Sequence, residues 1–230
     1  AHRHWFHENP SRRRVQRQCP EFFDACPPVE RSTHVNERYT FDHASPVSKK
    51  GTHVTINPPS AAPRVLPTYQ QVAALPRELG PFVIPAEYED ENGHMNVRHY
   101  FDLALTAVNT VFERIGIVDE YRRSRGQGIF TAEHHLSYYA EVHAGESVSG
   151  YYTFVDRSDK VFHGMAFLLN DDTRRLVYSL EVVAPHVDMT TRRVVPFGDD
   201  LAAIVDAEID RTAHREFKLP VCGTMGIRRP

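Results

Sequence analysis

The sequence predicts an α+β fold in which an antiparallel sheet of about five strands wraps around one long helix. Two observations lead to this prediction. Residues 95–115 carry apolar side chains at helical spacing, and from residue 129 onward four β-type runs follow one another, separated by turn-type clusters. Because a sheet with one apolar face needs a cover, the long helix is expected to pack on that face.

Residues 1–66 differ in composition from the rest of the chain. They are rich in Pro, Arg, His and Ser and hold no sustained helical or alternating apolar period. Such a composition rarely buries enough apolar surface to offset the entropy lost on ordering. The sequence therefore predicts an N-terminal extension over residues 1–66, poorly structured and without an assigned function, and a folded domain over residues 67–230.

The bulk composition excludes several classes of protein. With 41% hydrophobic residues, 25% charged residues and a net charge of −3, the chain is globular in character and has no global positive field to attract nucleic acid. It has no run of about 18 apolar residues and begins with no apolar leader. Its three cysteines (Cys19, Cys26 and Cys222) cannot form a disulfide framework or a Cys-x-x-Cys zinc pair. We expect a cytoplasmic protein with no nucleic-acid partner and no membrane association.

Two short elements are expected before the long helix. Residues 68–79 (TYQQVAALPREL) favour a short helix that ends at Gly80, and residues 81–88 (PFVIPAEY) form a β-type run. The long helix follows, and Gly116 stands where its C-terminal stop is expected. Its apolar stripe consists of Phe101, Ala104, Leu105, Val108, Val111, Phe112 and Ile115.

Residues 119–128 are expected to form a polar link between the long helix and the sheet. The four β-type runs are rich in Val, Tyr, Phe and Leu and cover residues 129–142, 147–157, 160–170 and 175–188. Turn-type clusters between the last three predict antiparallel hairpins. A final helix is expected over residues 196–215, with Asp199 or Asp200 near its start.

The stretch EDENGHMNVRHY, residues 89–100, places more polar groups before the long helix than a helix start requires. One capping side chain suffices, so Asp90 is either a turn or cap acid, or a nucleophile or general base. Gly93 is either an ordinary turn glycine or a position where positive φ or close approach to a ligand demands glycine. His94 either positions a substrate or bonds to a neighbouring carbonyl, and Asn96 more simply holds the loop.

The Asp90-x-x-Gly93-His94-x-Asn96 stretch, with the element order and TAEHHLSY (131–138), resembles the hot-dog fold acyl-CoA thioesterases of the 4-hydroxybenzoyl-CoA thioesterase-like branch. DENGHMN is similar to the form found in thioesterases associated with carnitine and betaine metabolism. The resemblance extends over about residues 80–210, including HVDMTTRRVVPF (186–197). One departure is Tyr88, which stands where many relatives carry a second Asp.

This resemblance implies hydrolysis of an acyl-CoA thioester to a free acid and coenzyme A. Asp90 would act as nucleophile or general base, and the helix N-terminus would polarise the thioester carbonyl. It implies no metal and no bound cofactor, because coenzyme A is part of the substrate, and a homodimer or dimer of dimers with sites between subunits. The implied catalytic residues are Asp90, Gly93 and His94; the candidate substrate-binding residues are Asn96, Tyr100, Glu133 and His135.

The roles within strand 129–142 remain open. Alternation places Glu133 and His135 on one face and His134 on the other. In the resembled fold this strand borders the site across the dimer, so Glu133 and His135 either support the site or form a surface pair. Tyr100, Tyr138 and Tyr139 either line an acyl pocket or belong to the core.

Two other functions compete with thioester hydrolysis. One is a hot-dog acyl-CoA hydratase or dehydratase, whose acid and histidine lie on a different loop, and the other is a catalytically silent acyl-CoA-binding module. The acyl group is not determined by the sequence, although the aromatic residues and the subgroup likeness favour a small polar group bearing a quaternary ammonium. Thiol release from a panel of acyl-CoAs distinguishes these functions.

Overall fold

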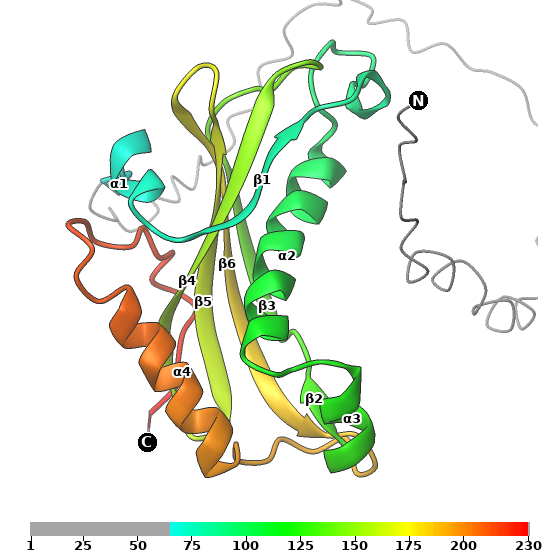
Figure 1. Ribbon diagram of the computed structural model, residues 1–230, viewed down its shortest axis with the longest axis vertical. Helices are drawn as coiled ribbons and strands as arrows, with labels where there is room; N and C mark the ends of the chain where they lie inside the picture. The colour runs from blue at the N-terminus through cyan, green and yellow to red at the C-terminus, as the bar shows by residue number, and fades with distance from the viewer. Residues whose placement is uncertain (1–64, 230) are drawn as a thin grey trace, which may run out of the picture. The chain divides into compact units, whose positions relative to one another are not determined.

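A six-stranded antiparallel sheet organises residues 65–229, the part of the chain that the computed structural model describes (Figure 1). Its order is β1-β4-β5-β6-β2, and β3 also pairs with β6. The strands are β1 (Arg77–Val83), β2 (Gln127–Ile129), β3 (Glu133–Tyr138), β4 (Ser147–Arg157), β5 (Val161–Asn170) and β6 (Arg175–Asp188). The predicted hairpins between β4, β5 and β6 are confirmed. The predicted extension over residues 1–66 lies outside the described residues, apart from its last two.

The long helix α2 (Val97–Arg114) covers one face of this sheet, here called the inner face (Figure 1). Ala104, Val108 and Val111 of the predicted stripe are buried in a core that includes Phe154 and Leu180 of the strands. Phe101, Leu105 and Phe112 of that stripe are only partly buried, because the helix turns Tyr100, Leu103 and Ala107 toward the sheet instead. The helix ends as expected, with Gly116 at a φ of +89°.

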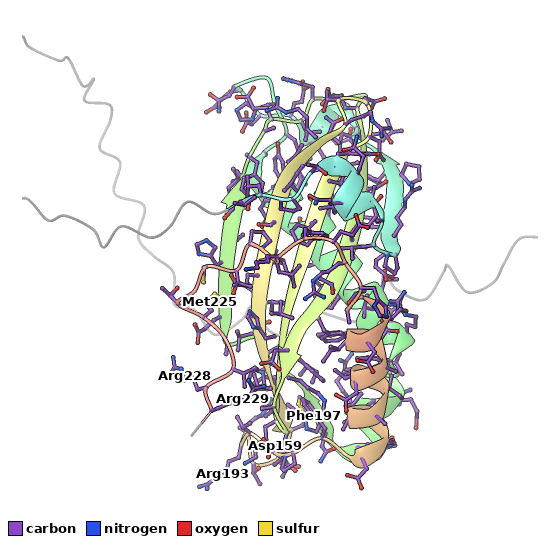
Figure 2. The ribbon with its side chains drawn as sticks, turned by 90° about the vertical axis from the view of Figure 1, so that its left-hand side faces the viewer. Asp159, Arg193, Phe197, Met225, Arg228 and Arg229 are labelled. Carbon is purple, nitrogen blue, oxygen red and sulfur yellow. The ribbon has the colours of Figure 1, made fainter. Side chains whose placement is uncertain are left out.

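The opposite, outer face of the sheet is also apolar. Tyr151, Phe167 and Leu169 are buried there against α1 (Tyr69–Ala73) and against a C-terminal segment, residues 217–229. Figure 2 views this face and shows the segment running across the strands to Arg228 and Arg229. A sheet covered on both faces explains why β5 and β6 are buried almost throughout their length.

The final helix α4 (Asp199–Arg211) lies beside β4. Asp199 and Asp200 lie in its first turn, as predicted, but the helix ends at Arg211, before the expected residue 215. Arg157 of β4 pairs with Asp206 of α4. Just past the end of the helix, the Thr212 hydroxyl lies 2.7 Å from that of Thr153. These contacts hold α4 along the part of β4 that β1 leaves unpaired.

Two predictions before α2 are wrong in their bounds. The helix expected to end at Gly80 ends at Ala73, because Pro76 lacks an N–H and disfavours helical backbone at the residue before it. Strand β1 consequently begins at Arg77, within the range expected to be helical. The expected β-type run over residues 81–88 closes with a 3-10 turn, Ala86–Tyr88.

The stretch between α2 and β4 also differs from its prediction. The expected polar link is a helix, α3 (Asp119–Arg125), with acids in its first turn, arginines in its last turn and Gly126 at a φ of +62°. The expected strand 129–142 is divided between β2 and β3 and ends at Tyr138. Both differences arise because these segments are short and depend on docking against β6.

Candidate active site

Asp90 lies in a turn that leads into α2 and is closed by a bridge between Glu89 and Met95. The Asp90 N–H donates to the His94 carbonyl at 3.1 Å, and the Gly93 N–H donates to the Asp90 carbonyl at 3.0 Å. Gly93 has a φ of +77°, and the space beside it is open. Positive φ is therefore the reason for a glycine here.

The carboxylate of Asp90 does not cap the helix, so the cap interpretation is wrong, whereas the interpretation as a turn acid agrees with its bond to the Asn92 N–H. The N-cap of α2 is Asn96, whose Oδ1 accepts the Arg98 N–H at 3.2 Å. Asp90 itself accepts the Asn92 N–H at 2.9 Å and the Asn96 Nδ2 at 3.4 Å. Its side chain is 21% exposed, and no lysine or arginine in the described residues pairs with it. The carboxylate is therefore oriented by neutral donors and open to a ligand.

Three backbone N–H groups in and just after the turn lack an acceptor in the described part of the chain, those of Glu91, His94 and Val97. Val97 is the first residue of α2, where the unpaired amides carry the positive end of the helix dipole. The His94 ring lies close by, with Nδ1 3.9 Å from the Asp90 Oδ1 and 3.4 Å from the Met95 carbonyl oxygen. A carboxylate next to free amides suits attack on a carbonyl whose oxygen gains negative charge.

A pocket of about 340 Å³ opens beside this turn. It is lined by His94, Met95, Val97, Tyr100, Tyr138, Tyr139, Ala140 and Glu141. The Tyr100 and Tyr138 rings meet edge to face at 5.5 Å. Burial is the main cause that raises the pKa of Tyr100 to about 12, so its hydroxyl stays neutral and donates to the Ala140 carbonyl. Tyr100 is thus a core residue that also lines the pocket, while Tyr138 is 48% exposed.

Glu133 and His135 are not brought to this turn. They share one face of β3, as predicted, but it is the outer face, where Glu133 lies 3.6 Å from Arg228 and His135 pairs in register with Glu181. The inner face of β3 carries His134, whose ring contacts Phe101 of α2. Alternation along the strand correctly placed Glu133 and His135 on one face and His134 on the other. Only the position of α2 shows which of these faces meets the core.

His134 lines a second, larger cavity of about 650 Å³ between the inner face and helices α2 and α3. Leu105, Val182 and Ala184 form apolar parts of its wall, and Asn109 adds a polar group. The His134 Nε2 is buried and has no hydrogen-bond partner in the described residues. Burial lowers the pKa of this imidazole, so it is neutral near pH 7.

Among residues 65–229, no group of His, Cys, Asp and Glu side chains is arranged to hold a metal ion. No helix in the same range is long and apolar enough to cross a membrane.

Comparison with known proteins places these features in a family. Residues 84–205, more than half of the chain, match the family model of the thioesterase-like superfamily. The chain belongs to this superfamily. The match includes the Asp90 turn, α2 and the strands from β2 to β6, whereas the C-terminal segment lies beyond it.

Two curated relatives of this thioesterase-like protein carry functional names. Betainyl-CoA thioesterase of Pseudomonas aeruginosa is 28% identical over 138 residues, which cover 60% of this chain and 85% of the relative. L-carnitine dehydrogenase/betainyl-CoA thioesterase of Agrobacterium fabrum is 29% identical over 139 residues, 60% of this chain but only 28% of that protein.

Solved structures share the fold of this thioesterase-like protein. A Staphylococcus aureus protein solved in complex with CoA superposes with a TM-score of 0.59 at 20% identity, covering 68% of this chain and 97% of its own. A putative thioesterase of Pseudomonas putida gives a TM-score of 0.54 at 21% identity, with the same coverage. The predicted family, the hot-dog fold and the class of thioester hydrolase are confirmed.

Proposed function

We propose that the protein is an acyl-CoA thioesterase in which Asp90 acts as nucleophile or general base. The observation that carries this proposal is the Asp90 carboxylate. It is open to a ligand, has no lysine or arginine partner among the described residues, and lies in the turn whose free amides precede and begin α2. The family supports it, as do the names of the two curated relatives. The fold neighbour solved with CoA is consistent with coenzyme A as part of the substrate.

The geometry supports a simple sequence of steps. The thioester oxygen lies at the N–H groups of His94 and Val97, which stabilise the negative charge that develops on it. Asp90 either attacks the carbonyl carbon and forms an acyl anhydride that water later cleaves, or takes a proton from the attacking water. In both routes the carbon–sulfur bond breaks and the sulfur leaves as coenzyme A thiolate. The Asn96 Nδ2 donates to the Asp90 carboxylate and so helps to orient it.

The pocket beside His94 favours a small acyl group that bears a quaternary ammonium. Tyr100 and Tyr138 supply aromatic rings, and Glu141 adds a carboxylate to the lining, whereas the Tyr139 hydroxyl bonds to Ser179 on the outer face. Such rings attract a quaternary ammonium through their electron-rich faces, by about 0.5–2 kcal/mol each. Both curated relatives are named for betainyl-CoA, whose acyl group has this chemistry.

One edge of β3 pairs with no other strand among residues 65–229, and this free edge supports assembly as a homodimer or a dimer of dimers. β3 pairs with β6 on one side, and Leu136 and Tyr138 are 37% and 48% exposed along it. Unpaired strand edges recruit further strands. A two-fold axis perpendicular to the sheet would pair two β3 edges in antiparallel fashion and keep both inner faces on one side. The Tyr138 end of one copy would then meet the His134 end of its neighbour, so Asp90 would lie close to the neighbour's residues 129–142.

Asp90→Asn tests the proposed function, with thiol release measured on short, aromatic, long-chain and betainyl acyl-CoAs. Asparagine keeps the size and one oxygen of the side chain but cannot attack or accept the proton, so kcat should fall by about 10²-fold or more. Glu91→Gln removes the neighbouring exposed acid and should keep the wild-type rate. Wild-type hydrolysis by Asp90→Asn would refute the proposal. Binding of acyl-CoA without thiol release by the unaltered protein would support the silent module, and hydration of an enoyl-CoA without thiol release would support the hydratase.

A further inference from the structure

His143 contacts the Asp90 turn from the loop that connects β3 to β4. Its Nδ1 lies 2.8 Å from the carbonyl oxygen of Gly93, a residue 50 positions earlier in the chain. Because a carbonyl oxygen only accepts, the His143 Nδ1 must carry the hydrogen of this bond. No motif in the sequence connects the two residues.

The same loop fixes both ends of the turn through other bonds. The Met95 N–H donates to the Val142 carbonyl at 2.7 Å, and the Ala144 N–H donates to the Glu89 carboxylate at 2.7 Å. The two ends of the turn, Glu89 and Met95, are therefore held whether or not residue 143 has a side chain. The His143 ring is the group of this loop that reaches the tip of the turn.

The peptide between Gly93 and His94 makes no other hydrogen bond of its own in the described residues, although the Gly93 N–H and the His94 carbonyl on either side of it both bond to the Asp90 backbone. Gly93 is exposed, and no atom lies within 4 Å of the place that a Cβ would take, so no side chain packs against the peptide on that side. In a trans peptide the C=O and the following N–H point in opposite directions. When the Gly93 carbonyl faces His143, the His94 N–H faces away from it and has no acceptor in the described residues.

We propose that His143 is a positioning residue for the reaction: its bond to the Gly93 carbonyl holds the Gly93–His94 peptide with the N–H directed at the thioester oxygen. This inference rests on the proposed function of the Asp90 site. His143 itself does not touch the substrate. Without its ring, the peptide samples orientations in which one of the two oxyanion donors is lost, while Asp90 and the substrate pocket remain in place.

The test compares His143→Ala with His143→Asn. Asparagine places an N–H donor at nearly the same distance from the backbone as the His143 Nδ1, so it can restore the bond, whereas alanine cannot. Removing a whole oxyanion donor lowers kcat by about 10²–10³-fold, and partial misorientation should lower it by about 10-fold. We expect this loss for His143→Ala, with KM within about twofold of wild type because the interaction is stronger in the transition state. His143→Asn should recover most of kcat.

A second measurement reads the carbonyl directly. In the Asp90→Asn background, the carbonyl carbon of a bound ¹³C-labelled acyl-CoA should show a polarised chemical shift that His143→Ala abolishes and His143→Asn retains. His214→Ala, which removes an exposed histidine near the end of α4, is the matched control and should change neither reading.

Three outcomes would overturn the inference: wild-type kcat in His143→Ala, a loss confined to KM, or no recovery in His143→Asn. If Asp90→Asn hydrolyses at the wild-type rate, the proposed function itself fails. If only Asp90→Asn loses activity, the proposed function survives and the role of His143 is refuted.

Discussion

Glu181 is a buried carboxylate that fastens the C-terminal segment to the outer face of the sheet, and its replacement by glutamine should destabilise the protein. Its side chain is fully buried. One oxygen lies 2.9 Å from the His163 Nε2, and the other accepts the Cys222 N–H at 2.6 Å. Cys222 belongs to the C-terminal segment, so this carboxylate joins that segment to β5 and β6.

The expected loss in the free energy of unfolding is about 3 kcal/mol for Glu181→Gln. Each hydrogen bond to a charged group contributes about 1.5–3 kcal/mol, and the replacement weakens two such bonds. Glutamine keeps one oxygen to accept a bond, which places the loss at the lower end. Its NH₂ group must then face either the Cys222 N–H, where two donors cannot bond, or the His163 ring, where a bond requires the Nε2 to be the unprotonated nitrogen.

The same group predicts a pH dependence. Burial by itself would raise the pKa of Glu181, but the hydrogen bonds from His163 and Cys222 outweigh it, and the pKa is lowered. A carboxyl group with a lowered pKa in the folded state stabilises the protein above its unfolded pKa of about 4.3, and this contribution is lost as pH falls through the folded pKa. The difference between the wild type and Glu181→Gln should therefore shrink as pH falls below about 4.

Urea unfolding at pH 7, followed by circular dichroism, measures the effect, and limited proteolysis reports release of residues 217–229. The matched control is Glu133→Gln on the same face, where the carboxylate is 38% exposed and lies 3.6 Å from Arg228. Such an exposed pair contributes at most about 1 kcal/mol. The reasoning is refuted if Glu181→Gln loses no more stability than Glu133→Gln.

Substitutions at three further positions test other parts of the structure. Asn96→Ala removes the helix cap and should lose about 1 kcal/mol of stability, and it should also slow hydrolysis. Asn96→Asp should keep the cap but lose the Nδ2 bond to Asp90, so its kcat should also fall. A wild-type kcat in Asn96→Asp would contradict the role of this bond. Gly164→Ala would put a Cβ 1.9 Å from the buried Tyr152 hydroxyl, so thermal unfolding should show a loss of about 1–3 kcal/mol or more, and an unchanged melting temperature would count against it. Leu136→Lys places a charge on the free β3 edge and should halve the mass measured by light scattering. An unchanged mass would show that the β3 edge is not the dimer interface.

The parts of the fold that the sequence predicted well are those whose signals are local. β4, β5 and β6 are long runs of β-type residues bounded by turn-type clusters, and their predicted bounds agree with the structure to within one residue. Helix α2 combines a sustained apolar period with a glycine stop. The shorter elements were predicted less well, because α1, α3 and β2 depend on the surface against which they dock.

The candidate site shows the same division. The Asp90 turn and its glycine could be located from the sequence because they are contiguous, and positive φ at Gly93 is a local demand. Only the structure showed that Asn96, not Asp90, caps α2, since both are acceptable caps and the start of the helix decides between them. The two cavities likewise combine residues from helices and strands far apart in the chain.

The sequence by itself determined the order of the main elements, the composition of each face of β3 and the polar turn before α2, because helical and strand periods repeat over neighbouring residues. It did not determine which face of β3 meets α2, that His143 reaches Gly93, or that Glu181 holds the C-terminal segment. These contacts join residues far apart in the chain, and their geometry exists only after the sheet has brought distant strands together. Local periodicity carries no information about that distance, so tertiary packing alone decided them.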